Sequence, residues 1–200
     1  MNLSSYAELA VRLANTGVQV PGEPDPLGSA EACSTALGDC LTGRVTRRDL
    51  AVLRYLRDEF TAIFGAAARG ADQDAMARIN ALLVQFPVQP ELVSHDDQRW
   101  HVHLAPHGSA SDQFAAGAAI GVALTVSLMG VNRLGICGIA SCPRVFIDAS
   151  PGKSRRYCTE HTAARGNVSA LHRQPDGLQP RGTDPKAPAG LPPHSTPAAS

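Results

Sequence analysis

The chain has 200 residues, of which 44% are apolar, with 18 basic and 18 acidic side chains. This length suits one domain plus a small module, and the composition excludes a wholly disordered chain. Zero net charge also argues against a chain that coats nucleic acid over its whole surface. The charge is uneven, however: residues 1–131 hold 9 Lys and Arg against 14 Asp and Glu, whereas residues 132–175 hold seven against two. Any nucleic-acid function is therefore expected in the basic segment 132–175.

The N-terminal part of the chain is predicted to be mainly helical. Apolar residues recur at helical spacing over four segments, which are separated by loops rich in Gly and Pro: 6–15, 29–42, 46–69 and 72–86. Ser29 is a candidate N-cap, and Thr46 followed three residues later by Asp49 has the pattern of a capping box.

Two further elements follow before residue 131. Residues 91–95 and 99–104 alternate polar and apolar side chains, which predicts a β-hairpin near 91–104. Residues 113–132 are uncharged, and that length could span a bilayer. Because Ala and Gly dominate there without flanking Trp or Tyr, we interpret the stretch as a buried helix, capped by Ser109 or Ser111, and expect no membrane partner.

The two ends of the chain lack such periodicity. The N-terminus shows no basic cluster followed by an apolar run, so no secretory signal is predicted and a cytoplasmic location is expected. Residues 176–200 are rich in Pro and Gly, which predicts a disordered tail.

Three of the five cysteines lie in the basic segment, at spacings typical of a metal site. Cys137 and Cys142 form one ligand pair, and Cys158 with His161 can form a second. Two short pairs separated by a hairpin-sized loop suit tetrahedral zinc, and three thiolates with one imidazole leave no open position for water. These spacings leave two interpretations open, one structural Zn²⁺ or three free buried cysteines.

The predicted fold class is α+β, mainly α with a small β-hairpin. A helical N-terminal domain over residues 1–131 precedes a small zinc-ribbon-like module over residues 132–175. About forty residues make too small a core to fold alone, so metal ligation is expected to stabilise this module.

The residues between the two ligand pairs resemble the CGNR zinc-finger family of bacterial proteins. Residues 142–158 read CPRVFIDASPGKSRRYC, with a Phe-x-Asp-x-Ser stretch followed by Ser-Arg-Arg-Tyr-Cys. The N-terminal part is similar to the ABATE domain in Leu-Ala-Asn-Thr at 13–16, in the helix around 53–57 and in the hairpin at Trp100. The resemblance spans residues 6–173 and implies a stress-induced transcriptional regulator with a nucleic-acid-binding zinc finger.

The chain departs from the family pattern at the fourth ligand. Thr162 stands where the family has a Cys, and Ala164 stands where it has the Asn of its tetrapeptide. We assign the fourth ligand to His161, because neutral imidazole binds zinc whereas a threonine hydroxyl stays protonated near neutral pH. His172 is a weaker substitute. The alternative is an eroded site stabilised by packing of Phe146 and Tyr157.

Six basic residues surround the predicted metal site and are the candidates for contacts with nucleic acid, DNA rather than RNA: Arg144, Lys153, Arg155, Arg156, Arg165 and Arg173. Such side chains neutralise phosphates, and arginines also read base edges. The alternative is a solvated basic face in which one or two arginines pair with Asp148 and Glu160. Adjacent Arg155 and Arg156 would point to opposite faces of a strand, so one of them is expected to be structural.

The remaining candidates are given structural interpretations. Asp148 is expected to cap the turn at Ser150, and Cys33 and Cys40 are expected to be buried free thiols. Four histidines on or near the hairpin are interpreted as solvated rather than as metal ligands: His95, His101, His103 and His107.

Nothing in the sequence has the pattern of an active site. A Gly-rich phosphate loop, a nucleophile elbow and paired catalytic carboxylates are all missing, so an enzyme is not expected. The predicted function is transcriptional regulation by binding nucleic acid. A small-molecule effector at the N-terminal domain and a second copy of the chain in a homodimer are further possible partners. The alternatives are a protein-interaction adaptor with a purely structural or degenerate finger, and a small-molecule-binding protein with a pocket in its N-terminal body.

Overall fold

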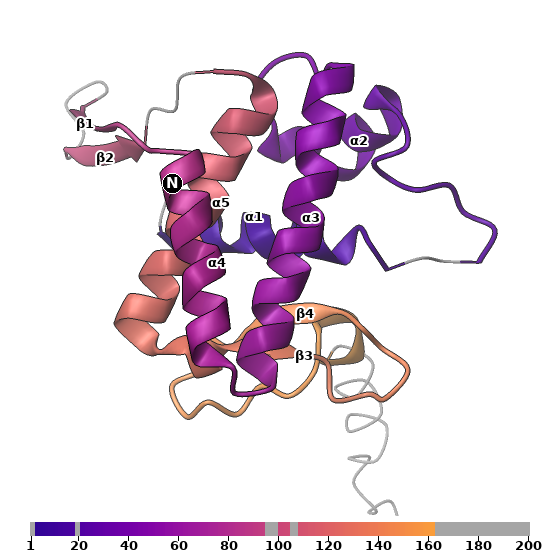
Figure 1. Ribbon diagram of the computed structural model, residues 1–200, viewed down its shortest axis with the longest axis vertical. Helices are drawn as coiled ribbons and strands as arrows, with labels where there is room; N and C mark the ends of the chain where they lie inside the picture. Colours follow the sequence, from indigo (N-terminus) through magenta and orange to yellow (C-terminus); the bar gives the residue numbers. More distant parts are fainter. Residues whose placement is uncertain (1–2, 19–20, 95–99, 105–107, 163–200) are drawn as a thin grey trace, which may run out of the picture.

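The computed structural model describes residues 3–18, 21–94, 100–104 and 108–162, and its fold is mainly helical with two small sheets (Figure 1). The elements follow the chain in this order: α1 Leu3–Asn15, α2 Ala30–Leu37, a 3-10 turn Gly38–Cys40, α3 Arg47–Ala68, α4 Asp72–Gln85, β1 Pro90–Val93, β2 His101–Leu104, α5 Ala110–Met129, a 3-10 turn Val131–Arg133, β3 Leu134–Ile136 and β4 Val145–Ile147. The predicted fold class is confirmed.

Side chains at the helix starts explain where the helices begin. Ser29 accepts a hydrogen bond from the N–H of Ala32, and Thr46 with Asp49 forms the predicted capping box of α3. Ser109 and Asp112 form a second capping box at α5. The prediction for 29–42 was too long, since α2 gives way at Gly38 to a 3-10 turn. Glycine costs about 1 kcal/mol in a helix interior, which favours an end there.

The helices pack around α5, which contacts α1, α3 and α4. Helices α3 and α4 lie side by side, and α1 crosses behind them (Figure 1). The crossing of α1 and α5 is unusually close, because a Cβ placed on Gly121 would lie 2.3 Å from the N atom of Ala7. Only glycine fits there, since real Cβ atoms do not approach backbone to that distance.

Helix α5 is the one described helix that is long and apolar enough to cross a membrane by length and composition. Its first three turns are nevertheless buried within the protein, including Phe114 and Val122. This agrees with its interpretation as a buried helix of the bundle.

The hairpin β1–β2 is antiparallel, with Glu91 opposite His103. The strands confirm the predicted hairpin, while the predicted connection at residues 96–98 lies outside the described residues. His95 and His107 also lie outside them, as do the side chains of His101 and His103, so the interpretation of these histidines stays a prediction.

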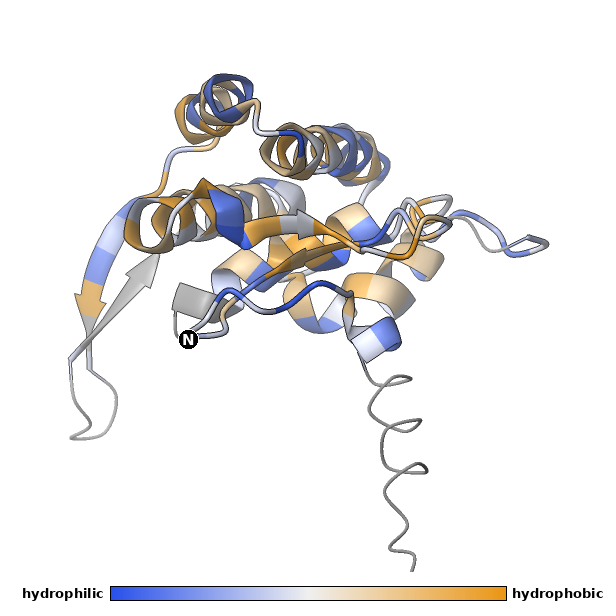
Figure 2. Cartoon of the chain, turned by 90° about the horizontal axis from the view of Figure 1, so that it is seen from below, coloured by the Kyte–Doolittle hydropathy of each residue, from blue (hydrophilic) through white to orange (hydrophobic). Residues whose placement is uncertain are grey.

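The second sheet, β3–β4, joins the C-terminal module to the helices. Leu134 pairs with Ile147 and Gly135 with Phe146. Strand β3 packs against α3 and β4 against α1, and both strands are strongly apolar (Figure 2). Leu134, Val145 and Ile147 belong to the same hydrophobic core as the helices. The predicted domain boundary between residues 131 and 132 stays a prediction.

Candidate metal centre and basic surface

The four predicted zinc ligands come from three short segments of the module. Cys137 directly follows β3, and Cys142 lies just before β4. Cys158 precedes a helical turn that begins at Thr159 and carries His161. Backbone hydrogen bonds hold these segments together: Cys137 N–H donates to the carbonyl of Arg144 at 2.8 Å, and Gly138 N–H donates to that of Arg156 at 2.8 Å.

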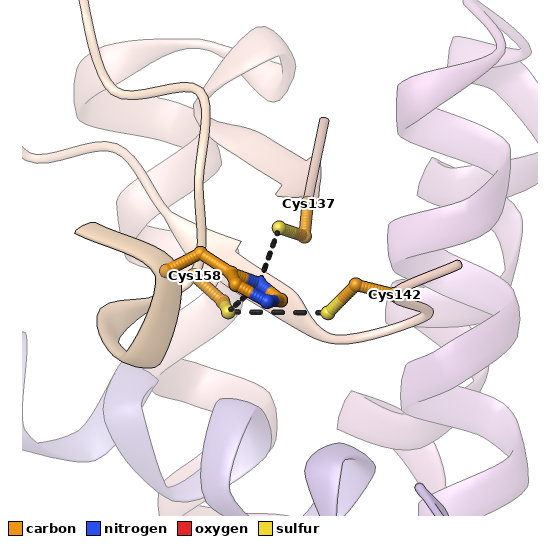
Figure 3. Close-up of side chains that lie close together, drawn as sticks. Cys137, Cys142 and Cys158 are labelled. Carbon is orange, nitrogen blue, oxygen red and sulfur yellow. Dashed lines mark hydrogen bonds between the residues drawn. The ribbon is translucent and has the colours of Figure 1, made fainter. Parts of the chain in front are cut away.

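The structure brings the four ligand atoms to within 4.8 Å of one another. The Nδ1 atom of His161 lies 3.3 Å from the sulfur of Cys137 and 3.3 Å from that of Cys158. The sulfurs of Cys142 and Cys158 are 4.0 Å apart, and the three cysteines point toward a common centre (Figure 3).

These separations fit a tetrahedral zinc ion. Zinc binds thiolate sulfur at about 2.3 Å and imidazole nitrogen at about 2.1 Å, so tetrahedral angles require about 3.8 Å between sulfurs and about 3.6 Å between sulfur and nitrogen. Three thiolates and one imidazole close the site. The module therefore has a site for one structural zinc, held by Cys137, Cys142, Cys158 and His161.

The surroundings of Cys137 favour its thiolate. Burial raises the pKa of this thiol, but hydrogen bonds from the backbone N–H groups of Cys158 and Ile139, and from His161, lower it to about 6. Burial raises the pKa of Cys142. These hydrogen bonds favour the thiolate of Cys137, which is the form of cysteine that binds a metal.

Thr162 points away from the metal centre. Its hydroxyl donates to the backbone carbonyl of Tyr157 at 3.2 Å, and its side chain is exposed. The side chain of Thr162, which stands where the family has a cysteine, therefore does not join the three thiols of Cys137, Cys142 and Cys158. His172, the substitute, lies outside the described residues.

A helical body with a small zinc-binding module at its C-terminal end is the architecture of a zinc-finger protein. Residues 7–128 match the ABATE family, described as "Putative stress-induced transcription regulator", and residues 133–174 match the CGNR zinc finger. Since the first match alone covers more than half of the chain, the chain belongs to the ABATE family. None of the curated proteins compared with the chain matches it.

Arg155 is a predicted nucleic-acid contact, but its guanidinium forms hydrogen bonds within the module. It donates to the carbonyls of Tyr157 at 3.1 Å and Ile147 at 3.2 Å and to the hydroxyl of Thr159 at 2.9 Å. Its guanidinium also lies 5.1 Å from the ring centroid of Phe146, a cation–π geometry. Of the adjacent residues Arg155 and Arg156, Arg155 is thus the one with a structural role.

The other predicted contacts differ in how accessible they are. Arg144 pairs with Glu160 at 2.9 Å. Lys153 is exposed and donates to Asn132 at 3.0 Å. Arg156 is exposed, and its side chain forms no hydrogen bond or ion pair with other described residues. Arg165 and Arg173 lie outside the described residues.

Asp148 caps its turn as predicted, and the structure adds a partner that the sequence patterns did not indicate. Its Oδ1 accepts from the N–H of Ser150 at 2.8 Å, and its Oδ2 accepts from the N–H of Arg155 at 3.1 Å. Arg133, which sequence reasoning had not placed in any site, donates to the carbonyl of Asp148 at 3.0 Å and to that of Ser150. Only the folded loop reveals this, because Arg133 follows α5 and precedes β3 without any motif.

The remaining cysteines are free thiols among the described residues. Cys33 is buried in the helical core, as predicted. Cys40 is only half-buried and accepts a hydrogen bond from Arg12 at 2.8 Å, because the helix ends before it.

Proposed function

We propose that this protein is a transcriptional regulator that binds DNA through its C-terminal zinc module. One observation carries the proposal: residues 132–175 hold seven basic side chains against two acidic ones, whereas residues 1–131 hold nine basic side chains against 14 acidic ones. Lys153 and Arg156 extend from one loop of that module and are exposed. Phosphate contacts by such side chains release counterions, which is the main source of sequence-independent affinity for duplex DNA.

The zinc site supports this role indirectly. It ties the segment after Cys158 to the two strands, so the basic loop 150–156 has a defined position relative to the helix that begins at Thr159. A fixed arrangement of cations costs less conformational entropy on binding than a mobile one.

The test is the salt dependence of DNA binding by the zinc-loaded full chain. Fluorescence anisotropy with a duplex of mixed sequence should give a Kd that rises steeply between about 50 and 200 mM salt. The slope of log Kobs against log salt over this range gives the number of phosphate contacts. Replacing both Lys153 and Arg156 with Gln should reduce the slope of log Kobs against log salt by about 1.8, since each contact contributes about 0.9. The matched control is Arg47→Gln, an exposed arginine at the start of α3. Absence of binding at low salt with the module folded would instead favour a protein-interaction adaptor.

A second candidate function, binding of a small-molecule effector, is favoured by a cleft between the helical body and the module. This cleft has a volume of about 860 Å³ and lies between α3, the start of α4 and the loop from Cys137 to Pro143. That volume lies within the usual range for ligand pockets. Its lining includes apolar Ala62 and Ile139 and basic Arg69. Arg78 also lines the cleft, but it forms ion pairs with Asp74 and Glu59.

Native mass spectrometry of the purified, zinc-loaded chain tests the effector. A retained ligand would appear as a discrete added mass, and Ala62→Trp, which fills the cleft, should abolish it. A chain that carries zinc alone would count against this candidate.

A further inference from the structure

A second, smaller cleft on the module is lined by an excess of positive charge. It has a volume of about 350 Å³ and lies between the end of α3 and the β3–β4 sheet. Gly135 and Phe146 line it from the sheet, and Ala68 lines it from α3. Four basic residues and a single acidic one complete the lining: Arg133, Lys153, Arg155, Arg156 and Asp148.

The acidic residue offsets only one of these four positive charges. Asp148 is buried, and both of its oxygens already accept hydrogen bonds from the N–H groups of Ser150 and Arg155. One carboxylate against four cations leaves three positive charges around the cleft.

Arg133 lies on the buried side of the cleft and pairs with Asp148. Its side chain is 11% exposed, and the nearest carboxylate oxygen, Oδ1 of Asp148, lies 4.0 Å from its NH1. That NH1 donates to two backbone carbonyls, while the buried Nε–H has no hydrogen-bond partner among the described residues. Asp148 therefore offsets the charge of Arg133, and the excess of positive charge at the cleft comes from Lys153, Arg155 and Arg156.

Lys153 and Arg156 supply exposed donors to the cleft. Lys153 is the one described non-glycine residue with a positive φ, at 50°, so its loop is held in a conformation that side chains disfavour. Its ammonium reaches across to Asn132, which also lines the cleft. The guanidinium of Arg156 forms no hydrogen bond or ion pair with the other described residues and is available for a ligand.

We infer that this cleft binds a phosphate group. A carboxylate carries one negative charge and would leave the excess uncompensated, whereas a phosphate carries more charge and more acceptor oxygens. Arginine matches phosphate oxygens with paired N–H donors, and lysine adds a point charge. The volume has room for the phosphate and an attached sugar. The inference deepens the proposed function and rests on it for the source of the phosphate, which is either the DNA backbone or a free nucleotide.

The test begins with inorganic phosphate and the full zinc-loaded chain, labelled with ¹⁵N. Phosphate is added at constant ionic strength, with acetate as the matched carboxylate, while the arginine Nε–H and the backbone amides of residues 153–156 are followed by NMR. Phosphate should shift these signals saturably and acetate should not. Lys153→Gln and Arg156→Gln should each weaken phosphate binding about tenfold, because each removes a charge-assisted hydrogen bond. Arg47→Gln, at the opposite end of α3 from the cleft, should change nothing.

Two further probes, a 20-bp duplex and adenosine monophosphate, separate the outcomes. If the cleft variants weaken both phosphate and duplex binding, the cleft takes a phosphate of the DNA backbone. If they weaken phosphate and nucleotide binding but leave duplex affinity unchanged, the cleft is supported as a nucleotide site and its link to DNA is wrong. If phosphate binds but no duplex does, the cleft stands and the proposed function falls. If the duplex binds while phosphate and acetate are equally inert, the inference is overturned and the proposed function stands.

Discussion

The side-chain amide of Asn15 forms hydrogen bonds with both backbone polar groups of Val145. The N–H of Val145 donates to Oδ1 of Asn15 at 2.8 Å, and Nδ2 of Asn15 donates to the carbonyl of Val145 at 3.1 Å. Asn15 ends α1 and Val145 begins β4, so this contact fastens the helical body to the metal module across 130 positions of sequence. It also satisfies polar groups at an edge strand that would otherwise need another partner.

Replacing Asn15 with Ala should therefore loosen the module from the helices. The change leaves the N–H and carbonyl of Val145 without their partner, and such a loss costs about 1–3 kcal/mol of unfolding free energy. Urea unfolding of the zinc-loaded chain measures that cost, and amide exchange at Val145 locates it. Asn80→Ala is the matched control, since Asn80 is exposed on α4. Unchanged exchange at Val145 would contradict the role assigned to Asn15.

Sequence patterns predicted the features of this fold that are local. The capping pair of Thr46 and Asp49 needs residues three apart, so spacing alone indicated it. The zinc ligands Cys158 and His161 are also three apart, and this spacing together with the resemblance to the CGNR family indicated the metal site. The contact between Asn15 and Val145 was not predictable in this way, because nothing in either segment specifies a partner so distant along the chain. The same holds for Arg133, whose place beside Asp148 depends on the folded loop.

Asp49 shows how a locally predicted cap gains a tertiary role. Its Oδ2 accepts from the N–H of Thr46 at 2.8 Å, and its Oδ1 accepts from the N–H of Ser111 at 3.0 Å and from the hydroxyl of Ser111 at 2.8 Å. One buried carboxylate thus joins the starts of α3 and α5. Burial alone would raise the pKa of Asp49, but the hydrogen bonds from Thr46 and Ser111 hold it well below its usual range.

Protonation of Asp49 should consequently weaken the fold in acid. A carboxyl whose pKa is lower in the folded state stabilises the protein above its unfolded pKa of about 3.9 and loses that contribution as the pH falls below it. Asp49→Asn should lower the unfolding free energy at pH 7 by about 2–3 kcal/mol, because an amide group would face hydrogen-bond donors.

Urea unfolding of the Asp49→Asn variant and the parent at pH 7 and at about pH 2.5, below the unfolded pKa, checks this prediction, and the gap in unfolding free energy between the two should narrow at the lower pH. Asp58→Asn is the control, because the Asp58 side chain is 80% exposed. A gap that stays constant over this range would show that ionisation of Asp49 does not stabilise the fold.

Gly121 should tolerate no side chain. A Cβ at this position would lie 2.3 Å from the N atom of Ala7 and 2.4 Å from the carbonyl carbon of Tyr6, both of them backbone atoms that cannot turn aside. Gly121→Ala should therefore force α1 and α5 apart and cost about 1–3 kcal/mol, measured by thermal or urea unfolding. Gly38→Ala provides the opposite case: a Cβ there meets nothing within 4 Å and φ is −57°, so the same change should be neutral or stabilising by up to about 1 kcal/mol. Equal effects of the two substitutions would rule out close packing as the cause.

The fourth zinc ligand gives the most direct test of the metal centre. Structural zinc in small fingers contributes about 10–16 kcal/mol of binding free energy, so one of four ligands accounts for about 3 kcal/mol, or roughly a hundredfold in affinity. His161→Ala should weaken zinc binding by that order, measured by competition with a chromophoric chelator, and should loosen residues 135–162 while the helices stay folded.

Thr162 supplies both the rescue and the control for this experiment. Thr162→Cys places a thiol where the family has one and should hold or raise zinc affinity, because a thiolate binds zinc and a threonine hydroxyl does not. Thr162→Ala should leave affinity unchanged, since that hydroxyl donates to the carbonyl of Tyr157 outside the cluster. Elemental analysis of the parent, purified without a histidine tag, should find one zinc per chain. A metal-free protein, or a His161→Ala variant that binds zinc as tightly as the parent, would show that His161 is not the fourth ligand.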